Sequence, residues 1–261
     1  MRVSADVTLE GQPRLALKGI SKRYGSVVAL DAVDFEVYPG EVVALVGDNG
    51  AGKTTLIKTI AGAHDPDEGN VFYEGAPVHI HSPEAANKLG IAVVYQDLAL
   101  CDNLDIVANL YLGRELKGSP FRLLSENEME LRARQILDQL AVTVRPLRRP
   151  VSSLSGGQRQ SVAVSRAVLW GSNVVLLDEP TAALGVEQTA MVLQLIRQLR
   201  DRGISVVLIS HNLAEVFRVA NRIVVLRLGR RVGTFTPSQD APERVVAAIT
   251  GGDALPGQAF V

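Results

Sequence analysis

The sequence is poor in cysteine and has no long apolar run. Its single cysteine, Cys101, excludes an intrachain disulfide framework and is typical of a reducing compartment. The longest apolar runs, such as Val42–Val46 and Val174–Leu177, are far shorter than the ~20 residues that a membrane-spanning helix needs. Residues 1–13 lack the apolar core of a secretory signal. We therefore expect a soluble chain, flexible over 1–13, that works at a membrane only through partners.

The chain also lacks an excess of charge of either sign. Its formal net charge is −1 and its sequence pI is about 6.4, without the basic bias of a typical nucleic-acid-binding protein. The basic loop Arg145–Pro150 is read as a solvated connector rather than a nucleic-acid patch. Composition therefore predicts no nucleic-acid partner, and 261 residues are enough for a sizeable core.

What the sequence does contain is a glycine-rich loop between an apolar strand, Val42–Val46, and a helix predicted over residues 55–61. This order, with Lys-Thr after the last glycine, is the P-loop arrangement, and the Lys-Thr pair argues against a dinucleotide-binding turn. The loop's N–H groups can cradle phosphate oxygens, Lys53 supplies a cation, and the Thr54 hydroxyl can ligate Mg²⁺. The predicted phosphate-binding residues are Gly47, Asp48, Asn49, Gly50, Ala51, Gly52, Lys53, Thr54 and Thr55.

Four runs are apolar at nearly every position, which is typical of parallel strands covered by helices on both faces. A polar element follows each run, and ligands bind at the carboxyl ends of strands in open parallel sheets. If the four strands are neighbours, these elements converge on one phosphate site. The runs are Val42–Val46, Ile91–Val94, Val174–Leu177 and Val206–Ile209, and the elements are the P-loop, Gln96, Asp178-Glu179 and His211.

Each polar element has a chemical role and a structural alternative. Asp178 is placed to hold Mg²⁺ through its water shell. Glu179 is placed to orient and deprotonate an attacking water, or else to sit as a carboxylate at a helix start. Gln96 could ligate the metal or hold the water, or bond to backbone. His211 could bind the γ-phosphate, or stand beside a helix N-cap. Tyr24 could stack on an adenine ring, or be a half-buried turn aromatic.

The remaining pattern suggests how the chain is divided. Strands are predicted over residues 14–20 and 27–37, with a turn at Lys22–Gly25 between them. From residue 103 to 149 the apolar spacing becomes helical. We expect a core with a β subdomain over 14–96 and 159–250, a helical subdomain over 97–158, and a flexible tail over 251–261.

Five segments in this order closely resemble the ATPase subunits of ABC transporters, from about Arg14 to Gly251. The string Leu-Ser-Gly-Gly-Gln is the most diagnostic, because other P-loop families lack it. The segments are Gly47–Thr55, Gln96, Leu154–Gln158, Val174–Glu179 and His211. Four residues of the string would form a second anion site where a helix begins, and they are Ser155, Gly156, Gly157 and Gln158.

The resemblance implies an α/β fold: a P-loop NTPase (RecA-like) core with a mostly parallel sheet, an antiparallel β subdomain and an inserted α-helical subdomain. It also implies ATP and Mg²⁺ as cofactors, and a second subunit whose signature string closes over the bound ATP. Since the chain has one P-loop, one signature and no internal repeat, a homodimer is the expected assembly.

A finer resemblance is to importers of simple sugars of the ribose, xylose and fructose type. It is seen in Val94–Leu98, Asn103–Asn109, Leu112–Glu115 and Glu179–Gly185. It implies an ATPase on the cytoplasmic face of the cell membrane, bound to integral-membrane permease subunits that work with a periplasmic or extracellular sugar-binding protein. A groove near residues 96–114 would accept a short permease helix. Gly185 departs from the family, where an aspartate is usual, and puts that aspartate's contact across the dimer in doubt.

Two other functions fit the sequence less well. A soluble ABC ATPase acting on nucleic acid or ribosomes would want long coiled coils, tandem cassettes or a basic arm, none of which is visible in the sequence. A phosphotransferase of the nucleotide-kinase type would need an acceptor site and a lid, and would not explain Leu154–Gln158.

Overall fold

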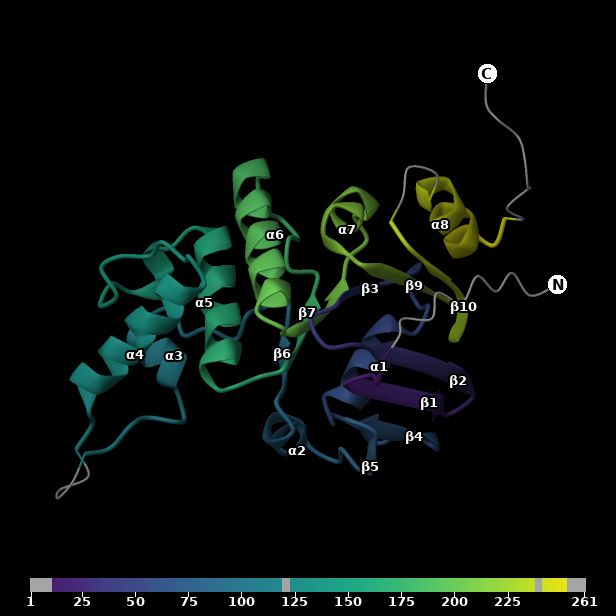
Figure 1. Ribbon diagram of the computed structural model, residues 1–261, viewed down its shortest axis with the longest axis horizontal. Helices are drawn as coiled ribbons and strands as arrows, with labels where there is room; N and C mark the ends of the chain where they lie inside the picture. The colour runs from purple at the N-terminus through teal and green to yellow at the C-terminus, as the bar shows by residue number, and fades with distance from the viewer. Residues whose placement is uncertain (1–10, 119–122, 238–240, 253–261) are drawn as a thin grey trace.

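The structure, a computed structural model, describes residues 11–118, 123–237 and 241–252 (Figure 1). The described strands are β1 (Leu15–Tyr24), β2 (Val27–Val37), β3 (Val42–Val46), β4 (Glu68–Tyr73), β5 (Ala76–Val78), β6 (Ile91–Val94), β7 (Val174–Asp178), β8 (Ser205–Ile209), β9 (Arg222–Arg227) and β10 (Arg230–Phe235). The described helices are α1 (Lys53–Ile60), α2 (Pro83–Lys88), α3 (Ile106–Tyr111), α4 (Glu126–Gln139), α5 (Gly156–Leu169), α6 (Val186–Asp201), α7 (Leu213–Val219) and α8 (Ala241–Thr250), with a 3₁₀ turn, η1 (Val151–Ser153).

The central sheet contains the four apolar runs side by side. Its strand order is β10-β9-β3-β8-β7-β6. The pairs β9–β3, β3–β8, β8–β7 and β7–β6 are parallel, and β10 is antiparallel to β9. Every residue of β3 and β8 is buried. The prediction that these runs are neighbours in a covered parallel sheet is therefore confirmed.

Side chains alternate between the two faces of this sheet, as the period of a strand requires. Leu45 and Ile209 face α1 and the second sheet, where they pack in one cluster with Leu56. Leu177 and Leu208 face the other way and pack with residues of α5 and α6. The helices α7 and α8 cover the β9 end of that second face. Burial on both faces explains why these strands lack polar positions.

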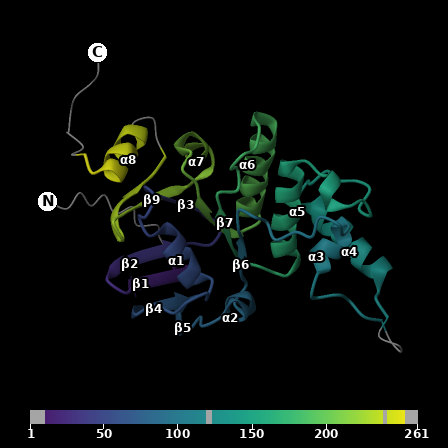
Figure 2. The same cartoon turned by 180° about the vertical axis from the view of Figure 1, so that it is seen from behind.

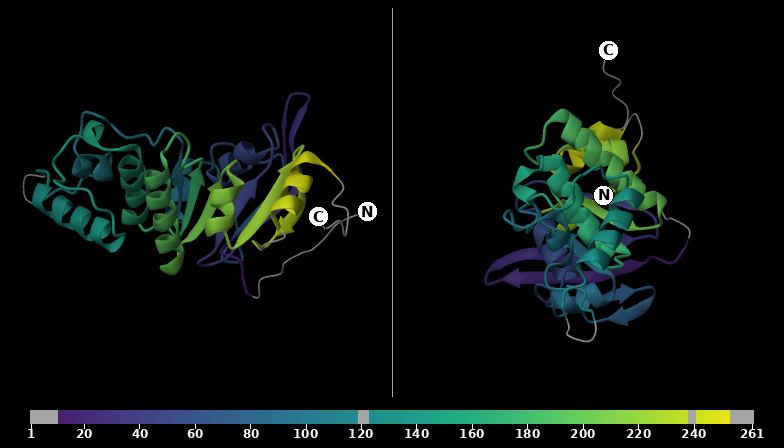
Figure 3. Two further views of the ribbon diagram at one scale, coloured as in Figure 1. Left: turned by 90° about the horizontal axis from the view of Figure 1, so that it is seen from above. Right: turned by 90° about the vertical axis from the view of Figure 1, so that its left-hand side faces the viewer.

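The second sheet is antiparallel, with the order β2-β1-β4-β5. Figure 3 shows it as a separate layer beneath the central sheet. One face of it contributes Leu15, Leu17 and Phe35 to the cluster it shares with α1 and the central sheet. The edge strand β5 contains Pro77, which suits an edge because proline has no N–H for a further ladder bond.

The helices α3, α4 and α5 form one end of the molecule, away from the antiparallel sheet (Figures 1 and 2). Ile106 of α3 and Met129 and Ile136 of α4 share a core cluster with Val162 of α5. This is the helical region expected from the apolar spacing, although its boundaries at 97 and 158 remain a prediction. Among the described residues, no helix is long and apolar enough to cross a membrane.

A buried ion pair joins the starts of β3 and β9. The Arg222 Nε and Nη2 atoms donate to the two carboxylate oxygens of Glu41 at 2.7 and 3.0 Å, and both residues are under 5% exposed. Tyr38 N–H also donates to Glu41, and Arg222 donates to the Glu36 carbonyl. Both the carboxylate and the guanidinium therefore have hydrogen-bond partners besides each other, as a buried ion pair requires.

One local prediction was wrong. Lys22–Tyr24 belong to β1, and the turn lies at Gly25-Ser26. The charged side chains suggested a loop, but they alternate on an exposed strand end that pairs with Val27 and Val28. The expected flexibility of 1–13 and of 251–261 falls largely outside the described residues.

Candidate nucleotide-binding site

Four neighbouring strands bring five of the predicted site elements to one edge of the central sheet, whereas Tyr24 and Ser155–Gln158 lie elsewhere, on the β1–β2 hairpin and at the start of α5. The P-loop follows β3, His211 follows β8 by one residue, Asp178 ends β7 with Glu179 after it, and Gln96 follows β6 by one residue. Because adjacent strands lie about 5 Å apart and the four run parallel, these elements share one edge. The convergence expected from the sequence is therefore present in the fold, while the roles of the residues stay predictions.

The P-loop depends on glycines at two close approaches. Gly47 has φ +152°, and a Cβ there would lie 2.2 Å from the Leu226 carbonyl oxygen. Gly52 has φ +104°, and its Cβ would lie 2.7 Å from the Ala29 carbonyl oxygen. A side chain at either position would displace backbone, so only glycine fits. The loop is thereby held against β9 and β2 while α1 begins directly behind it.

Lys53 lies across this loop. Its Nζ donates to the carbonyl oxygens of Gly47 at 2.7 Å and Asp48 at 3.0 Å. Burial lowers the pKa of Lys53, against the opposing negative charges of Glu179, Asp48 and Asp178. The ammonium group is thus held by neutral carbonyls, which leaves it able to move to phosphate oxygens of higher charge.

The two acidic residues after β7 differ in environment. Burial raises the pKa of Asp178, although Lys53 and Lys58 oppose the shift. Glu179 lies 2.7 Å from His211, between Oε2 and Nδ1, and its side chain is 19% exposed. Its backbone has φ +49°, and its N–H donates to the Ile209 carbonyl at 3.0 Å. A non-glycine residue in this left-handed region is strained, and such strain is concentrated at functional sites.

The site has an oxygen donor set suitable for Mg²⁺. The Thr54 hydroxyl comes from α1, the Gln96 amide from the loop after β6, and the half-buried Asp178 carboxylate from the end of β7. Mg²⁺ prefers such hard oxygen ligands. Gln96 is exposed. It makes no hydrogen bond with the described part of the chain, so the structural alternative of an amide bonded to backbone gains no support. The residues fit a magnesium ion.

Tyr24 lies at the tip of the β1–β2 hairpin and is 48% exposed. Its hydroxyl is 3.2 Å from Nδ1 of His64, and the two rings are edge-to-face at 5.8 Å. His64 in turn lies 3.2 Å from the hydroxyl of Thr59 on α1. Sequence reasoning missed His64, because nothing in its local pattern indicates that the hairpin tip reaches it.

The signature string forms the N-terminus of α5. Ser155 is the N-cap and accepts from the Gln158 N–H, while the Gln158 side chain accepts from the Ser155 N–H. This is a capping box. A Cβ on Gly156 would lie 2.6 Å from Leu184, and one on Gly157 would lie 3.0 Å from Gln188. The glycines therefore let this helix end pack closely on the segment that follows Glu179.

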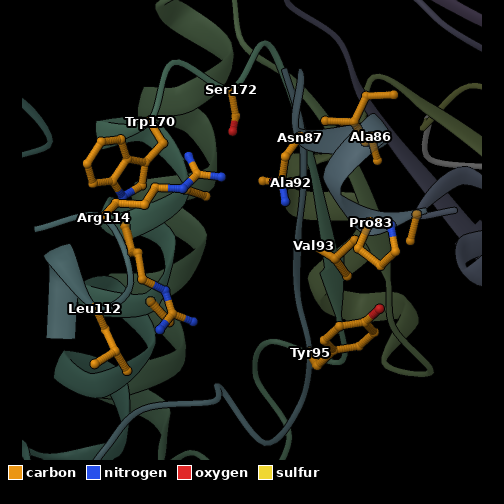
Figure 4. A pocket seen from close by; sticks show the side chains of 15 residues that line it. Pro83, Ala86, Asn87, Ala92, Val93, Tyr95, Leu112, Arg114, Trp170 and Ser172 are labelled. Carbon is orange, nitrogen blue, oxygen red and sulfur yellow. The ribbon is translucent and has the colours of Figure 1, made fainter. Parts of the chain in front are cut away.

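A groove of about 290 Å³ lies between α2, β6, α5 and the segment after α3. Figure 4 shows Tyr95 and Pro83 on one side, with Leu112, Arg114 and Trp170 opposite. The Arg114 guanidinium lies over the Trp170 ring at 5.0 Å. None of the residues lining the groove is acidic. Of the residues 96–114 near which a groove was expected, Leu112 and Arg114 line this one and Gln96 does not; its occupation by a permease segment stays a prediction.

Comparison with known proteins agrees with this geometry. The family model "ABC transporter" matches residues 30–182. The fructose import ATP-binding protein FrcA of Rhizobium meliloti is 48% identical, covering 95% of this chain and 98% of its own length. The xylose/arabinose import ATP-binding protein XylG of Sulfolobus acidocaldarius is 46% identical, covering 90% and 93%. This chain spans 46% of the ribose import ATP-binding protein RbsA 1 of Rubrobacter xylanophilus, at 42% identity.

Solved structures show the same fold. A nucleotide-free ATP-binding cassette from an ABC transporter superposes with a TM-score of 0.76 at 25% identity, covering 90% of this chain and 95% of the cassette. A dimeric bacterial ABC transporter cassette gives a TM-score of 0.71 at 26% identity, covering 86% and 99%. With a family model matching over half of its length and relatives close to half identical, the chain belongs to the ABC transporter family, among its ATP-binding proteins.

Proposed function

We propose that the chain binds and hydrolyses ATP at the edge formed by the P-loop, Gln96, Asp178, Glu179 and His211. The observation that supports this most directly is the strand order, because it brings a phosphate-binding loop and two acidic residues from separate parts of the sequence to one edge. The P-loop amides and Lys53 would hold the triphosphate, and Tyr24 would stack on the base.

Glu179 is proposed as the general base. Its carboxylate would accept a proton from the attacking water, and His211, 2.7 Å away, would fix the orientation of that carboxylate and reach the γ-phosphate. Mg²⁺, held by Thr54, Gln96 and Asp178, would neutralise charge on the phosphates when bound. The left-handed backbone of Glu179 costs stability, and this supports a role in which the direction of the carboxylate is needed for function.

Two copies of the chain would share each nucleotide. The capped end of α5 is the second place where free N–H groups and a helix dipole can meet an anion. In a symmetric pair, this end of one copy would face the P-loop of the other. The dimeric cassette among the structural neighbours supports this assembly. The homodimer would close on ATP and open after hydrolysis.

The work done by this cycle is proposed to be import of a simple sugar. The named relatives are import ATP-binding proteins for fructose, xylose or arabinose, and ribose. The chain would sit at the cytoplasmic face of the membrane, with a permease segment in the groove beside Trp170. A periplasmic or extracellular sugar-binding protein would deliver the substrate to the permease.

The dimer is tested with Ser155→Arg. A large cation at the N-cap should block the anion site of α5 while leaving the P-loop intact, so ATP binding is retained and ATP-dependent dimerisation is lost. Ser155→Ala is the comparison: it removes the hydroxyl and its cap bond, typically worth about 1 kcal/mol, without adding bulk or charge, so it should weaken dimerisation far less than Ser155→Arg. Sedimentation in the presence of Mg²⁺-ATP measures the outcome. A Ser155→Arg protein that dimerises like the parent contradicts the shared site.

The transport role is tested in the source cell. Deleting the gene should abolish uptake of one labelled monosaccharide among fructose, ribose and xylose, and the intact gene should restore it. Uptake of all three at the parental rate would overturn the proposed cargo. The purified chain would still hydrolyse ATP in that case, so the two parts of the proposal fail separately.

A further inference from the structure

The basic loop Arg145–Pro150 contains three arginines with different partners. Arg145 donates to Asp138 at 2.9 Å. Arg148 lies within 3.4 Å of three carboxylates, those of Asp105, Glu126 and Glu130. These two tie the loop to the helical end of the molecule, so the loop is more than the solvated connector expected from its sequence. Arg149 has no carboxylate partner among the described residues and is the one that these contacts leave unexplained.

Arg149 instead points to the signature string. Its Nη2 donates to the Oε1 of Gln158 at 3.1 Å. Its Nε is buried and has no hydrogen-bond partner in the described part of the chain. A buried donor without a partner destabilises a fold, and natural proteins rarely leave one. The Nε of Arg14 is also buried without a partner, so what sets Arg149 apart is the bond of its guanidinium to the signature string.

The contact fixes the side-chain amide of Gln158. Its Oε1 accepts from both the Ser155 N–H, at 3.2 Å, and Arg149. Turning the amide over would set its NH₂ group against two donors and lose both bonds. With Oε1 occupied, the Nε2 group has no partner among the described residues and keeps both of its hydrogens for an incoming acceptor. Gln158 stands in the first turn of a 14-residue helix, whose positive end favours an anion.

We propose that Arg149 is a positioning residue of the signature string: it holds the Gln158 amide with its donor side free, and thereby raises the affinity of this helix end for the triphosphate bound to a second copy. The inference rests on the nucleotide-sharing dimer proposed above. Arg149 acts on that site through its bond to Gln158.

The test uses the full chain carrying Glu179→Gln, in which slow hydrolysis lets the ATP-bound dimer accumulate. Arg149→Met keeps most of the aliphatic stem and removes the guanidinium. We expect the dissociation constant of the ATP-dependent dimer, measured by sedimentation, to rise about tenfold, as for loss of one charge-assisted hydrogen bond. ATP affinity of the monomer should not change. Arg145→Ala removes a charge from the same loop and should leave the dimer unchanged.

Two further readouts separate this role from a structural one. The unfolding midpoint of Arg149→Met should not fall, because the variant also removes the buried Nε donor. If Arg149 had only a structural role, the variant would lower both the unfolding midpoint and the affinity of the ATP-dependent dimer. In a Gln158→Met background, Arg149→Met should have no additional effect on dimerisation.

Unchanged dimerisation in Arg149→Met overturns the inference, as does a full tenfold effect in the Gln158→Met background. If the Glu179→Gln parent stays monomeric with ATP, the proposed dimer is wrong and this role falls with it. If the parent dimerises and Arg149→Met does too, only the inference fails.

Discussion

Replacing Glu179 by glutamine should separate ATP binding from ATP hydrolysis. The substitution keeps the size of the side chain and leaves an Oε1 atom that can accept from His211 Nδ1, 2.7 Å away in the parent. What it removes is the basicity of the carboxylate and one negative charge near Lys53 and Asp178. The backbone N–H bond to Ile209 remains, so the local fold should be kept.

The expected loss follows from the role of a general base. Such a group contributes about 10²–10⁴-fold to a rate, which corresponds to about 3–5 kcal/mol at 1.36 kcal/mol for each factor of ten. ATP affinity should stay equal or rise slightly, because a charge of the same sign as the triphosphate is lost from the site. The reduction therefore belongs to kcat, with KM nearly unchanged.

Phosphate release from the purified chain measures kcat, and a fluorescent ATP analogue measures affinity. Glu243→Gln is the matched control, since Glu243 is an exposed residue in the first turn of α8, and it should hydrolyse ATP at the parental rate. Turnover of Glu179→Gln within threefold of the parent would refute the assignment of Glu179 as the base. A loss of ATP affinity equal to the loss of kcat would show that the substitution damaged the site instead.

Three further substitutions have expected outcomes. Asp178→Asn should raise the unfolding midpoint of the nucleotide-free chain at pH 7. Burial lifts the folded pKa of Asp178 above its ordinary 3.8, so the ionised carboxylate lowers stability at pH 7, and the gain should vanish once the pH falls below both the folded and the unfolded pKa. Calorimetry across pH 4–8 checks the sign. Arg222→Met should lower the free energy of unfolding by about 3–5 kcal/mol, because it leaves Glu41 buried without its counter-ion. Urea titration measures this, and a variant that unfolds at the same urea concentration as the parent would contradict it. Gly185→Asp should be tolerated and stabilise α6 by a few tenths of a kcal/mol, since Gly185 is an N-cap at φ −72° with nothing within 4 Å of an added Cβ; a lower melting temperature would count against the open N-cap.

The parts of the molecule that could be predicted from sequence are those fixed by local chemistry. The P-loop was recognisable because its glycines, Lys53 and Thr54 follow one another in one short segment. The carbonyls of Leu226 and Ala29 that exclude a side chain at Gly47 and Gly52 come from distant strands and became visible only in the structure. The four apolar runs were recognisable because burial on both faces removes every polar position. The prediction that the polar residues after these runs converge then followed from the rule that parallel strands place their carboxyl ends at one edge of the sheet.

The parts that could not be predicted depend on long-range register. Nothing local to Tyr24 indicates that its hydroxyl meets His64, 40 positions away. The pairing of Arg149 with Gln158 requires the chain to turn through η1, and three arginines in one loop look alike until their partners are known. The strand β5 contains Pro77, and a proline argues against a strand unless that strand is known to lie at an edge.

Several residues that the proposals assign to the nucleotide are held in environments that the nucleotide-free chain satisfies poorly. Glu179 has a strained backbone, burial disfavours the charged forms of Asp178 and Lys53, and Arg149 has an unpaired buried donor. A triphosphate with Mg²⁺ would supply opposite charges to Lys53 and to Asp178, so binding would offset penalties that folding alone leaves in place. One set of these unfavourable environments lies at the sheet edge and the other at the start of α5. In the proposed dimer, each nucleotide would contact the sheet edge of one copy and the start of α5 of the other, so the shared site would be complete only when the two copies close.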